Sequence, residues 1–234
     1  MEYIKENLKS VKERISRAEE KSGRQKGSVT LIAVSKTYPP ELINEAIENG
    51  VTDIGENRVQ EIMEKYDKVK NVRWHLIGHL QKNKVKYIID KIELIHSVDS
   101  LALAEEINKQ AKKIGKIQEI LLEVNVSGEE SKFGLTPKDC LAAAGEISKL
   151  ENVRIRGLMT VAPNTDDEEL LRSVFSGLKQ ISLDIKENLA DTIDMSILSM
   201  GMTNDFPIAI ECGATMVRVG TGIFGKRSAL ERGY

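Results

Sequence analysis

The sequence has few cysteines and lacks long apolar runs. Only 2 cysteines occur among its 234 residues, Cys140 and Cys212, and they are far apart and form no CxxC pair. This excludes a disulfide framework and is typical of a protein in a reducing compartment. No stretch approaches the roughly 18 consecutive apolar residues of a membrane helix, and the first residues lack the hydrophobic core of a signal peptide. We therefore expect a soluble, cytoplasmic protein that does not enter a membrane.

The chain also lacks an excess of charge of one sign. Its 34 basic residues balance 36 acidic residues, and the net charge is −2. Proteins that bind nucleic acids through the phosphate backbone usually carry a strong basic excess, so we expect no nucleic-acid partner. With 41% hydrophobic and 30% charged residues, the chain is long enough for a core that needs no disulfide or metal. We find no linker and expect one domain, residues 1–234.

The hydrophobic pattern alternates between the periods of strands and helices. Ile4, Leu8, Val11 and Ile15 lie on one face of an expected N-terminal helix. Helices are then expected between and after successive strands, including one at 81–89 and one that begins at Pro137. The strands are expected at 29–35, 53–55, 72–78, 93–98, 117–126, 153–161, 194–199 and 216–219. This alternation predicts an α/β fold, a single (β/α)8 TIM barrel with an extra N-terminal helix, and a doubly wound open sheet is the alternative.

Lys36 directly follows the first expected strand. In (β/α)8 barrels the active site is built at the C-terminal ends of the strands, and Lys36 is expected there. A lysine amine in such a position can attack a carbonyl carbon and form a Schiff base. The alternative is a solvated lysine at a strand end, which is the commoner situation for a lysine considered alone.

The last two expected strands end in residues suited to an anion. Ser199 ends one strand, and Gly220 and Thr221 follow the other. Glycine lets backbone N–H groups approach an anion closely, and hydroxyl groups add donors, although Gly-Thr-Gly is also consistent with a simple tight turn. Arg218 interrupts an apolar strand and faces away from Val217 and Val219, so it points into the barrel. It either contacts a ligand or forms a structural ion pair.

Together, these residues describe a site for pyridoxal 5′-phosphate (PLP): a Schiff-base lysine, an arginine for the ring nitrogen and a group of phosphate donors. One alternative is a cofactor-free aldolase in which Lys36 reacts directly with a sugar phosphate. Although His75 and His79 have HxxxH spacing, they straddle a strand end and a turn and have no evident third ligand. We therefore expect no metal site. His96, in the fourth strand, is interpreted as a core residue with its hydrogen bonds satisfied.

Several segments resemble the YggS/PROSC-type PLP-binding proteins, also called PLP homeostasis proteins. These segments span nearly the whole chain and lie at residues 32–39, 55–61, 74–84, 123–127, 132–134, 156–160, 199–205 and 217–222. The family is similar in fold to the N-terminal barrel of alanine racemase. The resemblance implies that Lys36 holds PLP as a Schiff base and that Arg218 bonds the pyridine nitrogen. It assigns the phosphate to Ser199, Gly220 and Thr221, and it places Asn57 near the 3′ oxygen and His75 near the ring.

The resemblance also bears on activity. Alanine racemases add a second domain whose tyrosine acts as the other acid/base, whereas this chain ends at Tyr234, just after the eighth expected strand. An arginine at the ring nitrogen should also weaken the electron sink of PLP. The resemblance therefore implies intracellular PLP (vitamin B6) homeostasis rather than enzymatic turnover, with PLP-dependent apo-enzymes as possible recipients and a monomeric state. A PLP-dependent amino-acid racemase of low activity is the alternative.

Overall fold

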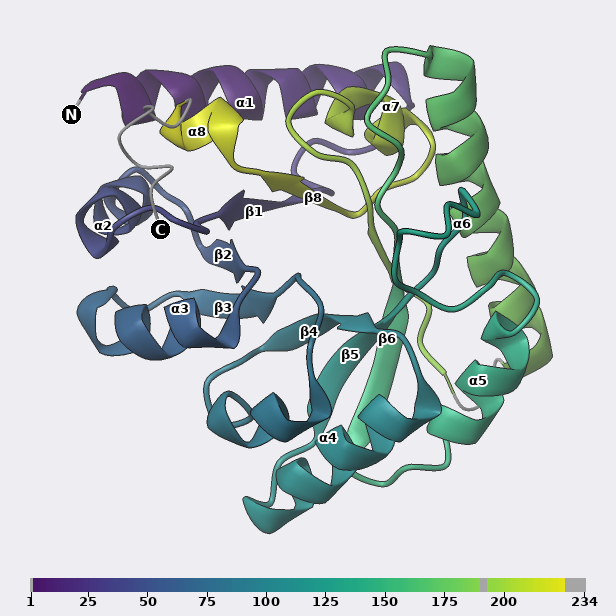
Figure 1. The fold of residues 1–234 in the computed structure, drawn as a ribbon. Coiled ribbons are helices and arrows are strands. Elements are labelled where there is room, and N and C mark those ends of the chain that lie inside the picture. Colours follow the sequence, from purple (N-terminus) through teal and green to yellow (C-terminus); the bar gives the residue numbers. More distant parts are fainter. Residues whose placement is uncertain (1, 190–192, 226–234) are drawn as a thin grey trace.

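Eight parallel strands form a closed barrel in a computed structural model that describes residues 2–189 and 193–225 (Figure 1). β1 pairs with β2 on one side and with β8 on the other, with Ile32 opposite Arg218 in the β1–β8 register. The strands are β1 Thr30–Val34, β2 Asp53–Glu56, β3 Arg73–Leu76, β4 Leu94–Val98, β5 Gln118–Glu123, β6 Val153–Met159, β7 Ile197–Ser199 and β8 Met216–Val219. The predicted (β/α)8 barrel is confirmed, and closure excludes the open sheet.

Helices surround the barrel on its outer side (Figure 1). Apolar residues on the outward faces of the strands and the inward faces of the helices form the main hydrophobic core. The helices are α1 Glu2–Lys21, α2 Pro40–Glu48, α3 Val59–Lys65, α4 Leu101–Lys113, α5 Cys140–Ile147, α6 Glu168–Leu189, α7 Phe206–Glu211 and α8 Thr221–Phe224, with 3₁₀ helices η1 Tyr66–Lys68 and η2 Lys82–Tyr87. None of the helices in these described ranges is long and apolar enough to cross a membrane.

The extra N-terminal helix is confirmed as α1, which lies beside α7 and α8 (Figure 1). Its predicted apolar face is buried, with Ile4 fully inaccessible and Leu8 and Val11 each 2% exposed. The side chain of Asn7 donates a hydrogen bond of 2.9 Å to the carbonyl oxygen of Ile223 in α8. The helix is therefore attached to the last elements of the barrel as well as covering its wall.

Two predicted helices were wrong in detail. The segment predicted as a helix at 81–89 forms the short 3₁₀ helix η2, in which only Val85 is buried. Ile88 and Ile89 of the predicted segment are also buried, but they follow η2 in a turn rather than in a helix. Pro137 lies in a turn rather than in a first helical turn, and α5 begins at Cys140. Six of the eight strands are shorter than predicted, whereas β2 extends one residue further, to Glu56, and β8 has the predicted bounds.

Alternation along each strand separates the outer core from the barrel interior. A small apolar cluster of Leu94, Leu121 and Met159 forms apart from the main core. Polar side chains also occupy the interior, and His75, His96 and Arg218 are each at most 4% exposed. Because a buried polar group is costly without a hydrogen bond, the contacts of these residues determine how the interior is organised.

Candidate functional site at the C-terminal end of the barrel

A cavity of about 600 Å³ lies at the C-terminal ends of β1, β7 and β8. Four of the seven predicted site residues line it: Lys36, Arg218, Gly220 and Thr221. Residues 163–165, which follow β6, and residues 202–205, which follow β7, complete the lining. The cavity therefore combines an amine, a guanidinium group and a glycine-containing loop. It lies at the end of the barrel where (β/α)8-barrel enzymes bind their ligands.

The backbone on both sides of Lys36 is fixed by a buried cluster of charges. Lys65 Nζ donates a hydrogen bond of 3.0 Å to the carbonyl oxygen of Ser35 and one of 2.8 Å to Glu61 Oε2. The same oxygen of Glu61 accepts 2.6 Å from the backbone N–H of Thr37. Thr37 has φ of 67°, in the left-handed region that non-glycine residues rarely adopt. Lys36 thus emerges from a constrained turn, which limits the positions that its backbone can take.

Arg218 is held in the barrel wall by oxygen acceptors. One terminal nitrogen donates hydrogen bonds to the carbonyl oxygen of Ser199, at 2.8 Å, and to Ser199 Oγ, at 2.7 Å. The other terminal nitrogen donates a hydrogen bond of 2.8 Å to the carbonyl oxygen of Thr160. Burial lowers the pKa of Arg218 to about 10, against the opposing charges of Glu123 and Asp205. The group therefore remains a cation at neutral pH, in a fixed orientation beside the cavity.

The loops after β7 and β8 meet at the edge of the cavity. Thr221 Oγ1 lies 3.4 Å from Thr203 Oγ1, which joins the two loops. Gly201 has φ of +92°, and a Cβ atom there would lie 2.9 Å from the Cα of Phe206. Only glycine fits this turn without strain, so the chain can pass closely over the start of α7. This packing shapes the side of the cavity that was predicted to hold phosphate.

The other three predicted residues do not line this cavity. Asn57 lines a separate cavity together with His79, and its buried Oδ1 has no hydrogen-bond partner among the described residues. His75 lies inside the barrel and bonds Asp53 and His96. Ser199 is fully buried, with its hydroxyl between Arg218 and His96. Their roles toward a ligand remain predictions.

Asn57 is in close backbone contact with the loop that follows β3. A Cβ atom on Gly78 would lie 2.5 Å from the backbone oxygen of Asn57 and 2.8 Å from its Cα. The absence of a side chain at Gly78 therefore allows the loops after β2 and β3 to touch. Such a contact fixes the position of Asn57 at the barrel mouth.

Sequence reasoning missed Glu123, the last residue of β5. It is 9% exposed, and its Oε2 atom is buried without a hydrogen-bond partner among the described residues. Burial, with a smaller contribution from the charge of Asp99, raises the pKa of Glu123 to about 7, while the charge of Arg218 opposes the shift. A charged residue directly after the apolar run Ile120–Leu122 was the available signal. The geometry adds that its carboxyl group is close enough to Arg218 to sense its charge.

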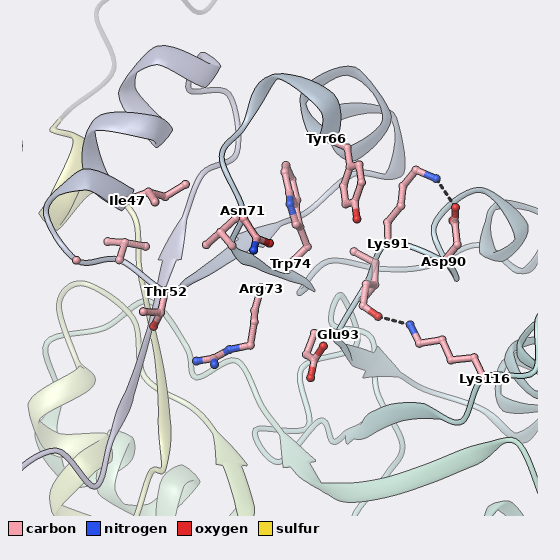
Figure 2. A pocket seen from close by; sticks show the side chains of 14 residues that line it. Ile47, Thr52, Tyr66, Asn71, Arg73, Trp74, Asp90, Lys91, Glu93 and Lys116 are labelled. Atoms are coloured by element: carbon pink, nitrogen blue, oxygen red, sulfur yellow. Dashed lines mark hydrogen bonds and ion pairs between the residues drawn. The ribbon is translucent and has the colours of Figure 1, made fainter.

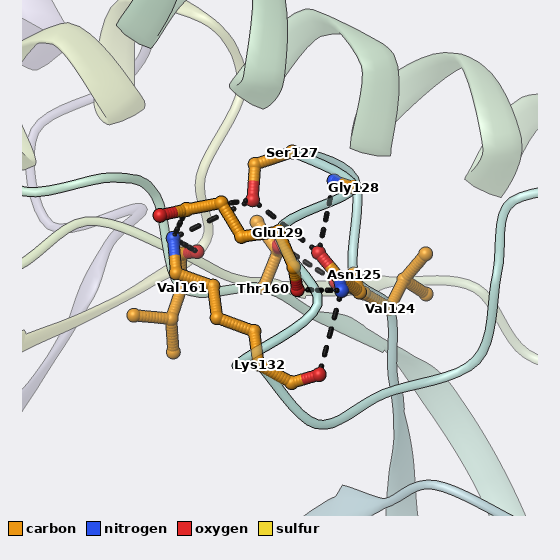
Figure 3. Close-up of polar contacts among 8 residues, drawn as sticks. All are labelled: Val124, Asn125, Ser127, Gly128, Glu129, Lys132, Thr160 and Val161. Carbon is orange, nitrogen blue, oxygen red and sulfur yellow. Dashed lines mark hydrogen bonds and ion pairs between the residues drawn. The ribbon is translucent and has the colours of Figure 1, made fainter.

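A polar network fixes the loop after β5 against the loop after β6 (Figure 3). Asn125 accepts 3.0 Å from the backbone N–H of Gly128 and donates 2.8 Å to the carbonyl oxygen of Glu129. Lys132 pairs with Glu129 and donates 3.3 Å to the carbonyl oxygen of Val161. The two segments quoted from this region, at residues 123–127 and 132–134, are thus parts of a single structured loop.

A second cavity, of about 650 Å³, lies at the opposite end of the barrel (Figure 2). Its lysines have structural partners, since Lys91 pairs with Asp90 and Lys116 donates 2.6 Å to the carbonyl oxygen of Ile92. Arg73 also lines it and pairs with Asp53 at 2.6 Å. Conserved chemistry in (β/α)8 barrels is found at the C-terminal end, so the cavity that contains Lys36 is the stronger candidate.

Several known proteins are similar to this chain over nearly its whole length. A curated relative from Aquifex aeolicus, named pyridoxal phosphate homeostasis protein, is 44% identical over 224 residues, covering 95% of this chain and 97% of the relative. A solved structure of an unknown protein from Bifidobacterium adolescentis has a TM-score of 0.90 and 38% identity, covering 95% of this chain and 94% of the other. PipY of Synechococcus elongatus, solved with PLP bound, has a TM-score of 0.83 and 35% identity, covering 95% of this chain and all of PipY.

The family model for the N-terminal domain of alanine racemase matches residues 6–228. This match includes every strand of the barrel, from β1 to β8. The racemase-like barrel and full-length similarity to the relatives above lead to the same assignment. The chain belongs to the family of pyridoxal phosphate homeostasis proteins, built on the barrel of the alanine racemase N-terminal domain.

Proposed function

We propose that this chain binds PLP at the C-terminal end of the barrel, covalently through Lys36, and acts in intracellular PLP homeostasis. The observation that carries the proposal is the shared cavity of Lys36, Arg218, Gly220 and Thr221. The names of the relatives and the PLP-bound PipY structure support it. PLP supplies an aldehyde that condenses with a lysine amine with loss of water. Its pyridine ring can act as an electron sink.

The residues of the cavity fit the parts of PLP. Lys36 presents the amine from a constrained turn, and Arg218 presents N–H donors suited to a ring nitrogen that carries no proton. Gly220 and Thr221 offer backbone N–H groups and a hydroxyl to the phosphate. We retain Ser199 in the phosphate group, Asn57 near the 3′ oxygen and His75 near the ring as parts of the proposal. The Ser199 hydroxyl already bonds two side chains, so Gly220 and Thr221 would carry most of the phosphate contact.

Arg218 also favours storage of PLP over turnover. A cationic guanidinium group beside the ring nitrogen disfavours its protonation, because two positive charges would then lie close together in a buried site. An unprotonated ring withdraws electrons less strongly, which disfavours carbanion chemistry. We therefore propose a carrier or buffer of PLP, with apo-enzymes as its recipients. A racemase of low activity is the alternative.

We also propose that residues 1–234 act as one domain, as a monomer in the cytoplasm, without a nucleic-acid or membrane partner. Two features of the described residues support the single domain. The barrel is closed by its own strands, and α1 attaches the start of the chain to α8. Sedimentation analysis with and without PLP tests the monomeric state, and a concentration-dependent dimer would contradict it.

Trapping the lysine tests the central proposal. Wild type, Lys36→Ala and a control, Lys82→Ala, are mixed with PLP, reduced with borohydride and digested for peptide mass analysis. Lys82 is exposed on η2. We expect PLP absorbance in wild type and the control, with the label on the peptide that contains Lys36, and no label at that peptide in Lys36→Ala. Absence of PLP uptake by wild type, or a label confined to another lysine, contradicts the proposal.

Turnover assays separate the alternatives. Incubation of the PLP-loaded protein with single amino-acid enantiomers is expected to give no more racemisation than the Lys36→Ala variant. Robust racemisation that depends on Lys36 favours the racemase. Uptake of PLP by Lys36 excludes the cofactor-free aldolase, since both would need the same amine.

A further inference from the structure

A chain of buried polar side chains crosses the barrel interior and ends at Arg218. It begins at Asp53 of β2, continues through His75 of β3 and His96 of β4, and reaches Arg218 of β8 through Ser199 of β7. The successive distances are 2.9 Å, 3.0 Å, 2.9 Å and 2.7 Å. All five residues are at most 4% exposed. We call this set the Asp53–Arg218 relay.

The two end groups of the relay determine the direction of the hydrogen bonds that they make themselves. Arg218 can only donate, so Ser199 Oγ accepts from it and directs its own proton to His96 Nδ1. At the other end, the carboxylate of Asp53 can only accept, so His75 Nε2 carries a proton. Burial tends to raise the pKa of Asp53, but hydrogen bonds from His75, Arg73 and Thr52 outweigh burial and hold that pKa well below its usual range. Asp53 is therefore an anion.

The two histidines are joined in the middle of the relay. Because His96 Nδ1 accepts from Ser199, the single proton of a neutral His96 lies on Nε2, which donates it to His75 Nδ1. Burial, together with the positive charge of Arg218, holds the pKa of His96 well below its usual range, so His96 is neutral. Each ring is then the Nε2–H tautomer, and every donor in the relay meets one acceptor. Such a fully satisfied network is rigid and mutually polarised.

The relay affects the hydrogen bond that Arg218 donates to Ser199. Because the proton of Ser199 is directed to His96, a lone pair of its oxygen faces the guanidinium group. The negative charge of Asp53 strengthens each acceptor in turn, so Ser199 Oγ becomes a better acceptor for Arg218. The carbonyl oxygens of Ser199 and Thr160 complete the support of the guanidinium group. Its remaining donor capacity is thereby oriented beside Lys36 and the cavity.

We propose that Asp53, His75, His96 and Ser199 are positioning residues for Arg218, joined in a hydrogen-bonded relay of fixed direction with both histidines as neutral Nε2–H tautomers. The relay holds the guanidinium group in the orientation that a ring-nitrogen ligand requires. This consequence for PLP rests on the proposed function, whereas the tautomers and the direction of the relay do not.

The first experiment needs no PLP. The chain has 3 histidines, so long-range ¹H–¹⁵N spectra of the ¹⁵N-histidine-labelled protein resolve every ring. His75→Asn and His96→Asn assign the signals. We expect Nε2–H tautomers for His75 and His96. In Ser199→Ala we expect the His96 Nδ1 signal to shift. The His75 signals should shift as well, because a hydrogen bond joins the two rings.

A matched control is available on the same strand. Ser97 is fully buried like His96, but its hydroxyl donates 2.6 Å to the carbonyl oxygen of Gly78 outside the relay. Ser97→Ala is expected to leave both ring signals unchanged. A doubly protonated His75, an Nδ1–H tautomer of His96, or a His75 signal that ignores the loss of the Ser199 hydroxyl overturns the relay.

The second experiment measures PLP affinity in variants of relay residues that do not line the cavity. Asp53→Asn keeps a hydrogen-bonding side chain and removes its charge, whereas His96→Gln interrupts the relay. Each is compared with Ser97→Ala at temperatures where circular dichroism shows all proteins folded. We expect His96→Gln to lower PLP affinity about tenfold, the effect of one lost buried hydrogen bond, and Asp53→Asn to lower it less.

These outcomes separate the two proposals. If wild type takes up PLP and both relay variants bind it as tightly, the relay positions nothing. If wild type does not take up PLP, the proposed function fails, while the tautomer spectra still decide whether the relay exists. A merely structural role would lower the stability of the variants without changing PLP affinity in the folded proteins.

Discussion

Lys65 and Glu56 form a buried ion pair directly behind Lys36. Lys65 Nζ lies 2.8 Å from Glu56 Oε1, and the two side chains are 9% and 0% exposed. Glu56 Oε1 also accepts 2.8 Å from the hydroxyl of Ser35, the residue before Lys36. A lysine that cannot itself reach the cavity thus organises the turn from which Lys36 emerges.

Removal of the Lys65 charge is expected to destabilise the fold strongly. Lys65→Met leaves Glu56 buried without its cation, which typically costs about 3–5 kcal/mol of unfolding free energy. Denaturant unfolding measures the loss. The double variant Lys65→Met with Glu56→Gln is expected to recover part of it, because no buried charge is then left unpaired. Equal stability of Lys65→Met and wild type would show that the pair is not truly buried in solution.

The turn at Thr37 is expected to store backbone strain. Thr37→Gly should raise the free energy of unfolding by about 1 kcal/mol, because glycine adopts positive φ without a Cβ clash. Thr37→Ala keeps the strain and serves as the control, and it should not be stabilised. Thermal unfolding of the three proteins checks the order. Stabilisation by alanine as large as by glycine would assign the effect to the threonine side chain instead.

Stability is expected to depend on pH through Glu123. Its pKa is about 7 in the folded protein, against an ordinary value of 4.5, so the folded state binds more protons between these values. The contribution of the neutral carboxyl group is complete below about pH 4.5 and is lost as the pH rises through about 7. The loss amounts to roughly 3 kcal/mol at most. Glu123→Gln should abolish this pH-dependent loss of stability.

Unfolding measured across this pH range checks the Glu123 prediction. The stability of Glu123→Gln relative to wild type should increase from acidic to mildly alkaline pH. Glu130→Gln, on the exposed loop that follows, is the control and should run parallel to wild type. Parallel curves for Glu123→Gln and wild type would mean that the Glu123 carboxyl titrates normally.

Two glycines are expected to respond oppositely to alanine. Gly78→Ala places a Cβ atom 2.5 Å from the Asn57 backbone oxygen and should cost about 1–3 kcal/mol through forced displacement. Gly145 lies in α5, where a Cβ atom would only touch Leu189 at 4.0 Å. Gly145→Ala should therefore stabilise the protein by about 0.5–1 kcal/mol. Denaturant midpoints compare the pair, and a tolerated Gly78→Ala would refute the close approach at Asn57.

Local patterns in the sequence determined the architecture of this protein and part of its site. The alternation of strand and helix periods specifies the barrel, because each period follows from the backbone geometry of its own element. Lys36 and Arg218 could be assigned to the same end of the barrel for a similar reason. One follows a strand, the other breaks the apolar pattern of a strand, and parallel strands end at the same side.

The tertiary structure alone decided which polar side chains meet. Ser199 was correctly expected at the end of a strand, but its hydroxyl bonds His96 of β4 as well as Arg218 of the neighbouring β8. His75, which is predicted to lie near the ring of the ligand, joins Asp53 to His96. Such contacts depend on barrel closure and on the register between strands far apart in the chain. No local period encodes them, so a single sequence could identify the lysine and the arginine but not the relay that supports them.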